Sequence, residues 1–274
     1  DGLAMEISQL VVNVSGTSSD AERAKVTWRL NGADASNVTG VYSSANDTIT
    51  FSGLSLSIAD GGSEIYTING YYNDNTGLTE DHTMILSMDG DTDVTIAGGT
   101  SMGATSAVSN SSGTTVDVTA TGLRLTTQAA GLVSGMAMTT QPVVAAEDAF
   151  GNIDSDFTEV VTGADEGINP GNVLTNNSVT AVAGVATFTS LTNTTATDGQ
   201  ALIVTFNDQD GIGSNLSTVS TSLLFTDVVA TQLQLTTQPA PLTVSSGEAK
   251  SLTTVPVVKA VDANGYVDTG YSSD

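Results

Sequence analysis

The chain carries one stretch twice, as Ala120-Thr-Gly-Leu-Arg-Leu-Thr-Thr-Gln-Ala-Ala130 and again as Ala230-Thr-Gln-Leu-Gln-Leu-Thr-Thr-Gln-Pro-Ala240, with 8 of 11 positions identical. A second stretch, Pro142-Val-Val-Ala-Ala-Glu-Asp-Ala-Phe-Gly-Asn-Ile-Asp154, returns as Pro256-Val-Val-Lys-Ala-Val-Asp-Ala-Asn-Gly-Tyr-Val-Asp268, with 8 of 13 positions identical. The first stretch recurs after 110 residues and the second after 114, so the later copy has four extra residues between them. A period near 110 residues is the length of one β-sandwich domain and exceeds one repeat of a solenoid.

The repeat predicts the domain organisation. We expect a β-sandwich module at residues 1–118, a complete domain at 119–229 and the beginning of a further domain at 230–274. The last copy stops about seventy residues short of a full domain of this length, which suggests a piece of a longer array. Residues 222–229 lead into the next copy without a flexible spacer, so we expect the domains to follow one another end to end and stiffly.

Composition favours an all-β fold. Apolar residues make up 39% of the chain, mostly Val, Leu, Ile and Ala in short runs among Thr, Ser, Gly and Asn. β-Branched residues lose side-chain freedom in helices and fit the pleated surface of strands. In Lys25-Val-Thr-Trp-Arg-Leu30, strict alternation places Val26, Trp28 and Leu30 on one face. We expect Trp28, the only tryptophan, to fill the core between two sheets.

Strands and turns follow from the same patterns. In the first domain the predicted strands cover residues 3–14, 25–30, 48–51, 54–58, 64–71, 82–88 and 94–97, with a final strand or linker in 101–116. Asn31-Gly32 and Asp60-Gly61-Gly62 are predicted turns. In the second domain, strands are predicted at 123–128, from Pro142 onward, at 178–188 and at 202–206, with turns at 149–152 and 168–171 and a loop at 209–213. In the copy that follows, 263–266 is the predicted counterpart of the turn at 149–152.

Charge and composition exclude several partners. Thirty acidic against six basic residues give a net charge of −24, which repels phosphate backbones and anionic membranes, so we expect no nucleic-acid binding. The sequence has no long apolar run, so direct membrane insertion is not expected. It has no cysteine for disulfides or thiolate metal sites. Because residue 1 is Asp and no signal peptide is present, the chain reads as processed or excerpted.

Residue types suited to catalysis are few. The single histidine, His82, lies in Glu80-Asp81-His82-Thr83 at the edge of a predicted strand. A Ser-His-Asp arrangement would need this histidine, and no Gly-x-Ser-x-Gly elbow presents a serine. No glycine is followed by Lys-Ser or Lys-Thr, as a phosphate-binding loop requires. We therefore predict that the protein is not an enzyme and that His82 is a surface or partly buried residue.

Acidic loops are the candidate cation sites. Calcium takes several oxygen ligands from carboxylates, backbone carbonyls and water, so a structural Ca²⁺ is the cofactor that this sequence could hold. The same aspartates have another interpretation, because Asp stabilises turns by accepting hydrogen bonds from its own backbone. The candidate ligands are Asp89, Asp91 and Asp93 in Asp89-Gly-Asp-Thr-Asp93, Asp208 and Asp210, and Asp148 with Asp154 and Asp156, repeated in part as Asp262 with Asp268.

The pattern Leu-x-Leu-Thr-Thr-Gln-Pro-Ala, followed by Pro-Val-Val-x-Ala-x-Asp-Ala-x-Gly-x-x-Asp, covers residues 120–274. It resembles tandem immunoglobulin-like domains of very large bacterial surface proteins and adhesins. The first domain, through Ile49-Thr-Phe-Ser-Gly-Leu-Ser-Leu-Ser-Ile-Ala-Asp-Gly61 and Tyr66-Thr-Ile-Asn-Gly-Tyr71, resembles an all-β module of secreted bacterial proteins. These resemblances imply secreted, extracellular spacers, fibres or attachment modules. Their implied partners are neighbouring domains of the same chain and a surface glycan or other cell-surface ligand.

Three functions follow as hypotheses. The leading one is a non-enzymatic structural or adhesive segment of a large bacterial cell-surface protein, with tandem immunoglobulin-like β-sandwich domains stiffened by calcium. The alternative is a set of accessory or carbohydrate-binding modules of a secreted multidomain hydrolase. In the third, the first domain itself binds a carbohydrate or a partner, with Tyr66, Tyr71 and Tyr72 as the aromatic residues to inspect.

Overall fold

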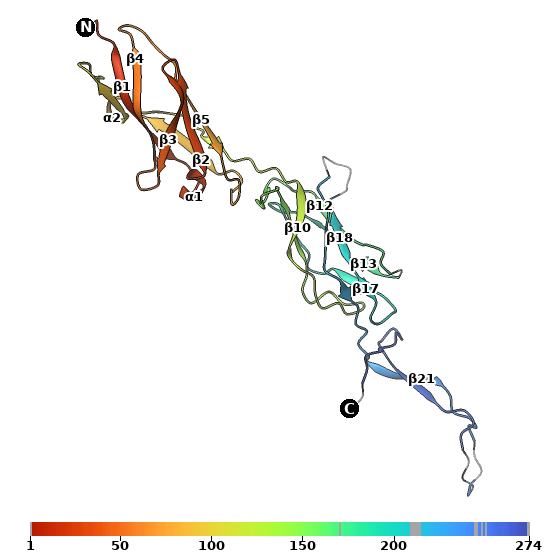
Figure 1. Cartoon of the computed structure of the whole chain (residues 1–274). Coiled ribbons are helices and arrows are strands. Elements are labelled where there is room, and N and C mark those ends of the chain that lie inside the picture. Colours follow the sequence, from red (N-terminus) through yellow and green to blue (C-terminus); the bar gives the residue numbers. More distant parts are fainter. Residues whose placement is uncertain are drawn as a thin grey trace. The chain divides into compact units, whose positions relative to one another are not determined.

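The computed structural model describes residues 2–169, 171–208, 215–243, 246–247, 249 and 251–272. Over these residues the fold is all-β with antiparallel sheets, as predicted, and the described helices are single turns, α1 (Asp20–Arg23) and α2 (Gly90–Asp93). The chain divides into two compact units (Figure 1). The first contains Asp1–Thr119 with Phe150–Ile153, and the second contains Ala120–Ala149 with Asp154–Asp274.

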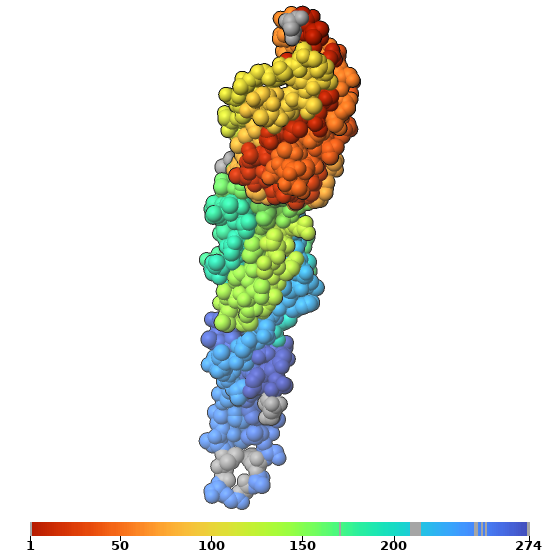
Figure 2. Space-filling model, turned by 90° about the vertical axis from the view of Figure 1, so that its left-hand side faces the viewer, coloured from red at the N-terminus to blue at the C-terminus, as the bar shows by residue number. Residues whose placement is uncertain are grey.

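The first unit is built on one antiparallel sheet of nine strands. Its strand order is β5-β2-β3-β4-β1-β6-β8, with β7 paired to β1 and β9 paired to β6. In Figure 2 the yellow part of the chain, which includes β7, lies against the red part, which includes its partner β1. The strands are β1 (Met5–Ser15), β2 (Val26–Gly32), β3 (Ala35–Ser43), β4 (Thr48–Ile58), β5 (Thr67–Tyr72), β6 (Thr83–Met88), β7 (Val94–Ala97), β8 (Val108–Ser109) and β9 (Thr114–Thr115).

The core of this unit follows the alternation of its strands. Trp28 and Leu30 are 5% and 1% exposed and belong to the hydrophobic core, which confirms the predicted face of β2. The two strands predicted at 48–51 and 54–58 are one strand, β4. Its pairing with β1 shifts register between Ile7 and Gln9, and Gly53 opposite has a φ of 68°. Glycine tolerates this left-handed conformation, and the irregularity keeps both halves of β4 directed into the core.

Two predicted boundaries are wrong for identifiable reasons. Asn31-Gly32 belongs to β2, and Gly32 pairs with Ala35, so the turn lies after it. A Cβ on Gly32 would collide with the Tyr66 ring, so this glycine provides room for an aromatic side chain. The strand predicted at 178–188 is interrupted by a tight turn, because Ala183 and Gly184 both have positive φ. Two such residues in succession form a primed hairpin turn.

The second unit contains several small antiparallel sheets. Their orders are β10-β11-β15, β14-β12-β18-β19, β13-β16, β17-β20 and β21-β22. In the core, the Phe188 and Phe206 rings pack with centroids 5.1 Å apart. The strands are β10 (Gly122–Thr127), β11 (Val143–Glu147), β12 (Val160–Asp165), β13 (Val173–Thr175), β14 (Ser178–Thr180), β15 (Val185–Thr187), β16 (Thr192–Thr194), β17 (Ala201–Leu202), β18 (Val204–Asn207), β19 (Val219–Ser220), β20 (Leu224–Phe225), β21 (Gln232–Thr237) and β22 (Val257–Val261).

The repeated stretches form the same hairpin in both copies. Leu123 pairs with Ala146 in β10–β11, and Leu233 pairs with Ala260 in β21–β22. Both pairings shift register two residues further along, after Leu125 and after Leu235. Leu123 is 7% exposed and lies in the core of the second unit, whereas Leu233 is 66% exposed. The two leucines therefore do not share one core.

Candidate functional site

The strongest predicted cation loop, residues 89–93, forms α2 and the residue that precedes it. The Asp93 carboxylate accepts hydrogen bonds from Asn13 Nδ2 and from the Asp89 backbone, both at 2.8 Å. Asp89 and Asp91 share the Thr105 hydroxyl, which lies 2.5 Å from one carboxylate and 3.1 Å from the other. A hydrogen bond with the Asp89 side chain lowers the pKa of Asp91. The loop therefore brings two of its three carboxylates together and turns the third towards β1.

The other predicted ligands lie apart from this loop. Asp208 is 1% exposed, and both of its carboxylate oxygens accept the Leu216 backbone N–H at 3.1 Å. Asp148 lines a hollow of about 220 Å³ together with Arg124, whose positive charge opposes a second cation. Asp210 lies outside the described residues. Within the described part of the chain, no three His, Cys, Asp or Glu side chains are grouped to hold a metal ion.

Asp154 and Asp268 make equivalent hydrogen bonds in the two copies of the repeat. The Asp154 carboxylate accepts the Ala120 N–H at 2.9 Å, and Asp268 accepts the Ala230 N–H at 3.0 Å. The second oxygen of Asp154 accepts two N–H groups of the following turn, each at 3.1 Å. Each aspartate thus ties the first residue of its copy to the turn that follows the hairpin. We call this contact the aspartate brace.

Asp262, another aspartate of the repeat, stabilises a turn. Its carboxylate accepts the backbone N–H groups of Asn264 at 2.9 Å and Tyr266 at 2.8 Å. The Asp262 side chain thus closes the turn after β22 by accepting hydrogen bonds from the backbone of that turn, as aspartates commonly do. The turn interpretation therefore accounts for Asp154 and Asp262, Asp268 is occupied by its brace to Ala230, and calcium binding at Asp148 and Asp154 stays a prediction.

His82 is part of a buried cluster around Glu22, a residue that the sequence analysis did not single out. Glu22 is 2% exposed and accepts hydrogen bonds from Ser19 N at 2.7 Å, Ser19 Oγ at 2.8 Å, Thr79 N at 2.9 Å and His82 Nδ1 at 2.9 Å. Burial by itself raises the pKa of Glu22, but these hydrogen bonds outweigh it and lower the pKa to about 2. The sequence signal was the capping box formed by Ser19 and Glu22 at the start of α1.

The geometry of this cluster fits a structural contact and differs from that of a nucleophilic serine. Ser19 and His82 both bind Glu22, so the carboxylate lies between the hydroxyl and the imidazole. A nucleophilic serine needs the imidazole next to its own hydroxyl. The cluster instead connects α1 to the chain that enters β6.

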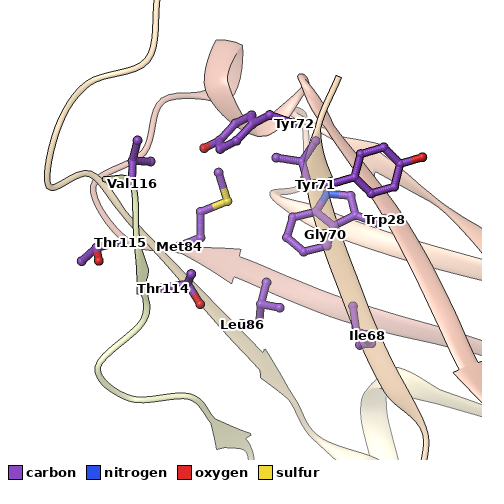
Figure 3. Close-up of a pocket in the computed structure, with 11 residues that line it drawn as sticks. Trp28, Ile68, Gly70, Tyr71, Tyr72, Met84, Leu86, Thr114, Thr115 and Val116 are labelled. Carbon is purple, nitrogen blue, oxygen red and sulfur yellow. The ribbon is translucent and has the colours of Figure 1, made fainter. Parts of the chain in front are cut away.

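A hollow of about 260 Å³ lies in the first unit between β2 and β5 on one side and β6 and β9 on the other (Figure 3). Trp28 pairs with Gly70 on β5 and with Gly40 on β3. A Cβ on Gly70 would lie 2.8 Å from the Trp28 ring, so glycine is needed where the ring covers this strand. The hollow is lined by Val26, Trp28, Ile68, Gly70, Tyr71, Tyr72, Met84, Leu86, Thr114, Thr115 and Val116.

Two polar atoms of this lining are buried without a hydrogen-bond partner among the described residues, Trp28 Nε1 and the Tyr72 hydroxyl. Burial, together with the negative charge of Glu22, raises the pKa of Tyr72. Tyr71 is 54% exposed, and its hydroxyl points away from the hollow (Figure 3). Tyr66 lies outside the lining and donates a hydrogen bond to Glu64 at 2.5 Å. The sequence marked Trp28 as a core residue but carried no signal for the hollow beside it.

The described residues thus define an all-β protein whose repeated hairpins carry equivalent aspartate braces. No known protein family model matches the chain, and no curated protein sequence matches it either. Neither α1 nor α2, the helices of the described residues, has the length or apolar run needed to cross a bilayer.

Proposed function

We propose that this chain is a non-enzymatic structural and adhesive segment of a large bacterial cell-surface protein, located outside the cell. Its domains are tandem immunoglobulin-like β-sandwiches that follow one another end to end, at residues 1–118, 119–229 and 230–274. The observation that carries this function is the repeated hairpin, which has the same register and the same aspartate brace in both copies. Serial copies of one domain extend a protein in length, which suits a spacer or an attachment shaft.

The exposed apolar face of the second hairpin supports the proposal that residues 230–274 belong to a third domain. Leu233 and Leu235 are 66% and 43% exposed, although their counterparts Leu123 and Leu125 pack in the core of the second unit. Burying such side chains stabilises a fold by roughly 1.5–3 kcal/mol each. We infer that further strands of an immunoglobulin-like domain cover this face, as buried residues of β12 and β18 share one core with Leu123 of β10.

A hydrogen-bonded junction within the second unit supports stiffness between successive copies. The Asp198 carboxylate accepts the Val228 N–H at 3.0 Å, the Thr269 N–H at 2.9 Å, the Thr269 hydroxyl at 2.5 Å and the Gly270 N–H at 3.3 Å. These bonds, led by the one from the Thr269 side chain, lower the pKa of Asp198. One carboxylate therefore joins a loop of residues 119–229 to the turn after β22, which restricts bending between the two copies.

Solution scattering tests the arrangement. The chain is expected to give the pair-distance distribution of an elongated string of domains, with a cross-section close to that of one domain. The variant Asp198→Ala should broaden the distribution by loosening the last junction, whereas Asp156→Ala, an exposed aspartate of the same unit, should leave it unchanged. A compact globule for the unmodified chain would contradict the proposed role as a shaft.

Calcium stiffening is the remaining part of the proposed function. Asp89 and Asp91 are the predicted ligands whose carboxylates meet, at the Thr105 hydroxyl. A hard cation bound there would connect α2 to residue 105 and stabilise the folded state alone, with a gain that grows as RT ln(1 + [L]/Kd).

A further inference from the structure

The hollow beside Trp28 lies where the two ends of the nine-stranded sheet meet. β5 ends the strand order on one side and β8 on the other, and both β5 and β6 line the hollow. A second hollow of about 280 Å³ shares Ile68 and Leu86 with the first and continues to Met88 and Val108. The sheet therefore curls so that its two ends face each other across an apolar groove, which the described strands leave open.

The size of the first hollow sets the size of its ligand. A cavity of about 150 Å³ is large enough for benzene, and sites for drug-sized molecules start near 300 Å³. At about 260 Å³ the hollow falls between these limits. In Figure 3 Met84 extends towards Tyr72 from β6, opposite the Trp28 ring, so aliphatic, sulfur and aromatic surfaces enclose the space.

The two unpartnered polar atoms set the polarity of the ligand. The indole N–H of Trp28 can only donate a hydrogen bond, and Trp28 is 5% exposed. A buried donor without a partner costs about 1–3 kcal/mol. A ligand oxygen that accepts from Trp28 or from the Tyr72 hydroxyl would remove this cost, so an acceptor is favoured over a pure hydrocarbon.

Charge excludes ionised ligands. The residues described as lining the hollow include no charged side chain, so neither a carboxylate nor an ammonium group finds a counter-ion there. Glu22 is close enough for its charge to act on Tyr72, and the whole chain carries −24, which disfavours anions further.

We propose that this hollow is a binding site for a small, neutral, mainly apolar molecule that carries one oxygen acceptor, such as a medium-chain ketone. The acceptor oxygen lies against the Tyr72 hydroxyl, and the hydrocarbon part lies against Met84, Leu86 and Ile68. The site is independent of the structural role of the chain, which does not require a ligand.

A fluorescence titration of the whole chain tests this site. Trp28 is the only tryptophan and lines the hollow, so its emission reports on the first unit at this site. The probes are 2-heptanone and heptanoate, which match in length and differ in charge. A saturable change with 2-heptanone at micromolar to millimolar concentration is expected, with at least about tenfold weaker binding of heptanoate. No saturable change, or equal binding of the two probes, would overturn the proposed site.

Two matched variants test the polar contact. Tyr72→Phe should weaken 2-heptanone binding by about three- to tenfold, the loss of one hydrogen bond, without lowering the melting temperature, because it removes an unpartnered hydroxyl. Tyr271→Phe changes an exposed tyrosine of the second unit and should leave affinity unchanged. Methyl NMR provides a readout independent of both variants, since Met84 should shift with 2-heptanone while Met136, exposed in the second unit, should not. Equal effects of the two variants, or an unmoved Met84 methyl signal, would refute the site.

Discussion

Replacing Glu22 by Gln tests the buried carboxylate that connects α1 to β6. The pKa of Glu22 is about 2 in the folded chain, against an ordinary value of 4.5. Each pH unit of difference corresponds to about 1.4 kcal/mol, so the ionised carboxylate stabilises the first unit by about 3 kcal/mol at neutral pH. Because the folded pKa is the lower one, this stabilisation is complete above about pH 4.5 and is lost as the pH falls towards 2. Glu22→Gln should therefore lose about 3 kcal/mol at pH 7.

Urea unfolding followed by Trp28 emission measures this loss in the first unit alone, because the chain has no other tryptophan. The experiment compares the wild-type chain, Glu22→Gln and Glu6→Gln between pH 7 and pH 2.5. Glu6 accepts one hydrogen bond from Ser57 at 2.6 Å and is the matched control, with an expected loss of about 1 kcal/mol or less. The difference between the wild-type chain and Glu22→Gln should shrink steadily below pH 4.5. A difference that is absent at pH 7, or that stays constant down to pH 2.5, would refute the reasoning.

Three further predictions concern the brace, the close approach at β5 and the metal. Asp154→Ala should destabilise the second unit by about 1–3 kcal/mol in calorimetry, because the N–H groups of Ala120 and Asp156 lose their acceptor and that of Phe157 keeps only the backbone carbonyl of residue 154. An exposed substitution, Asp156→Ala, should change stability by less than about 0.5 kcal/mol. Gly70→Ala should cost the first unit about 1–3 kcal/mol in urea unfolding, since its Cβ would lie 2.8 Å from the tryptophan ring, while Gly99→Ala, which meets no atom within 4 Å, should be close to neutral. Millimolar calcium should raise the melting temperature by several degrees over a chelator control, and Asp91→Asn should abolish the difference; identical melting curves for the unmodified chain would remove calcium from the proposed function.

The sequence predicts this fold well where a local pattern has one structural solution. Alternation identified Trp28 and Leu30 as core residues of β2, and the repeat identified the segments that form β10, β11, β21 and β22, whereas their pairing with one register is a finding of the structure. Prediction from the sequence fails where a glycine could either form a turn or make room for a side chain. Gly32 makes room for Tyr66 from another strand, and nothing in the residues next to Gly32 distinguishes that use from a turn.

The candidate sites could not be predicted in full either, because their contacts join residues far apart in the sequence. Glu22 and His82 are 60 residues apart in sequence, and their contact follows from how β6 returns to α1. Asp93 was grouped with Asp89 by spacing, but its carboxylate is occupied by the side chain of Asn13 on β1 and by the Asp89 backbone N–H. Sequence spacing identifies residues that could share a ligand, whereas tertiary hydrogen bonds decide which carboxylates remain available.

Comparing the two copies of the repeat distinguishes residues needed for folding from residues free to serve recognition. Both keep the aspartate brace and the leucines of the first strand. The ion pair between the exposed Arg124 and the buried Glu147, at 3.4 Å, is replaced in the second copy by Gln234 and Val261 at the same register positions. An ion pair with one partner in solvent contributes little to stability, so the fold tolerates this loss, whereas each brace gives a backbone N–H group its acceptor. The repeated pattern is therefore explained by folding, and specific recognition is to be sought outside it, above all beside Trp28 in the first unit.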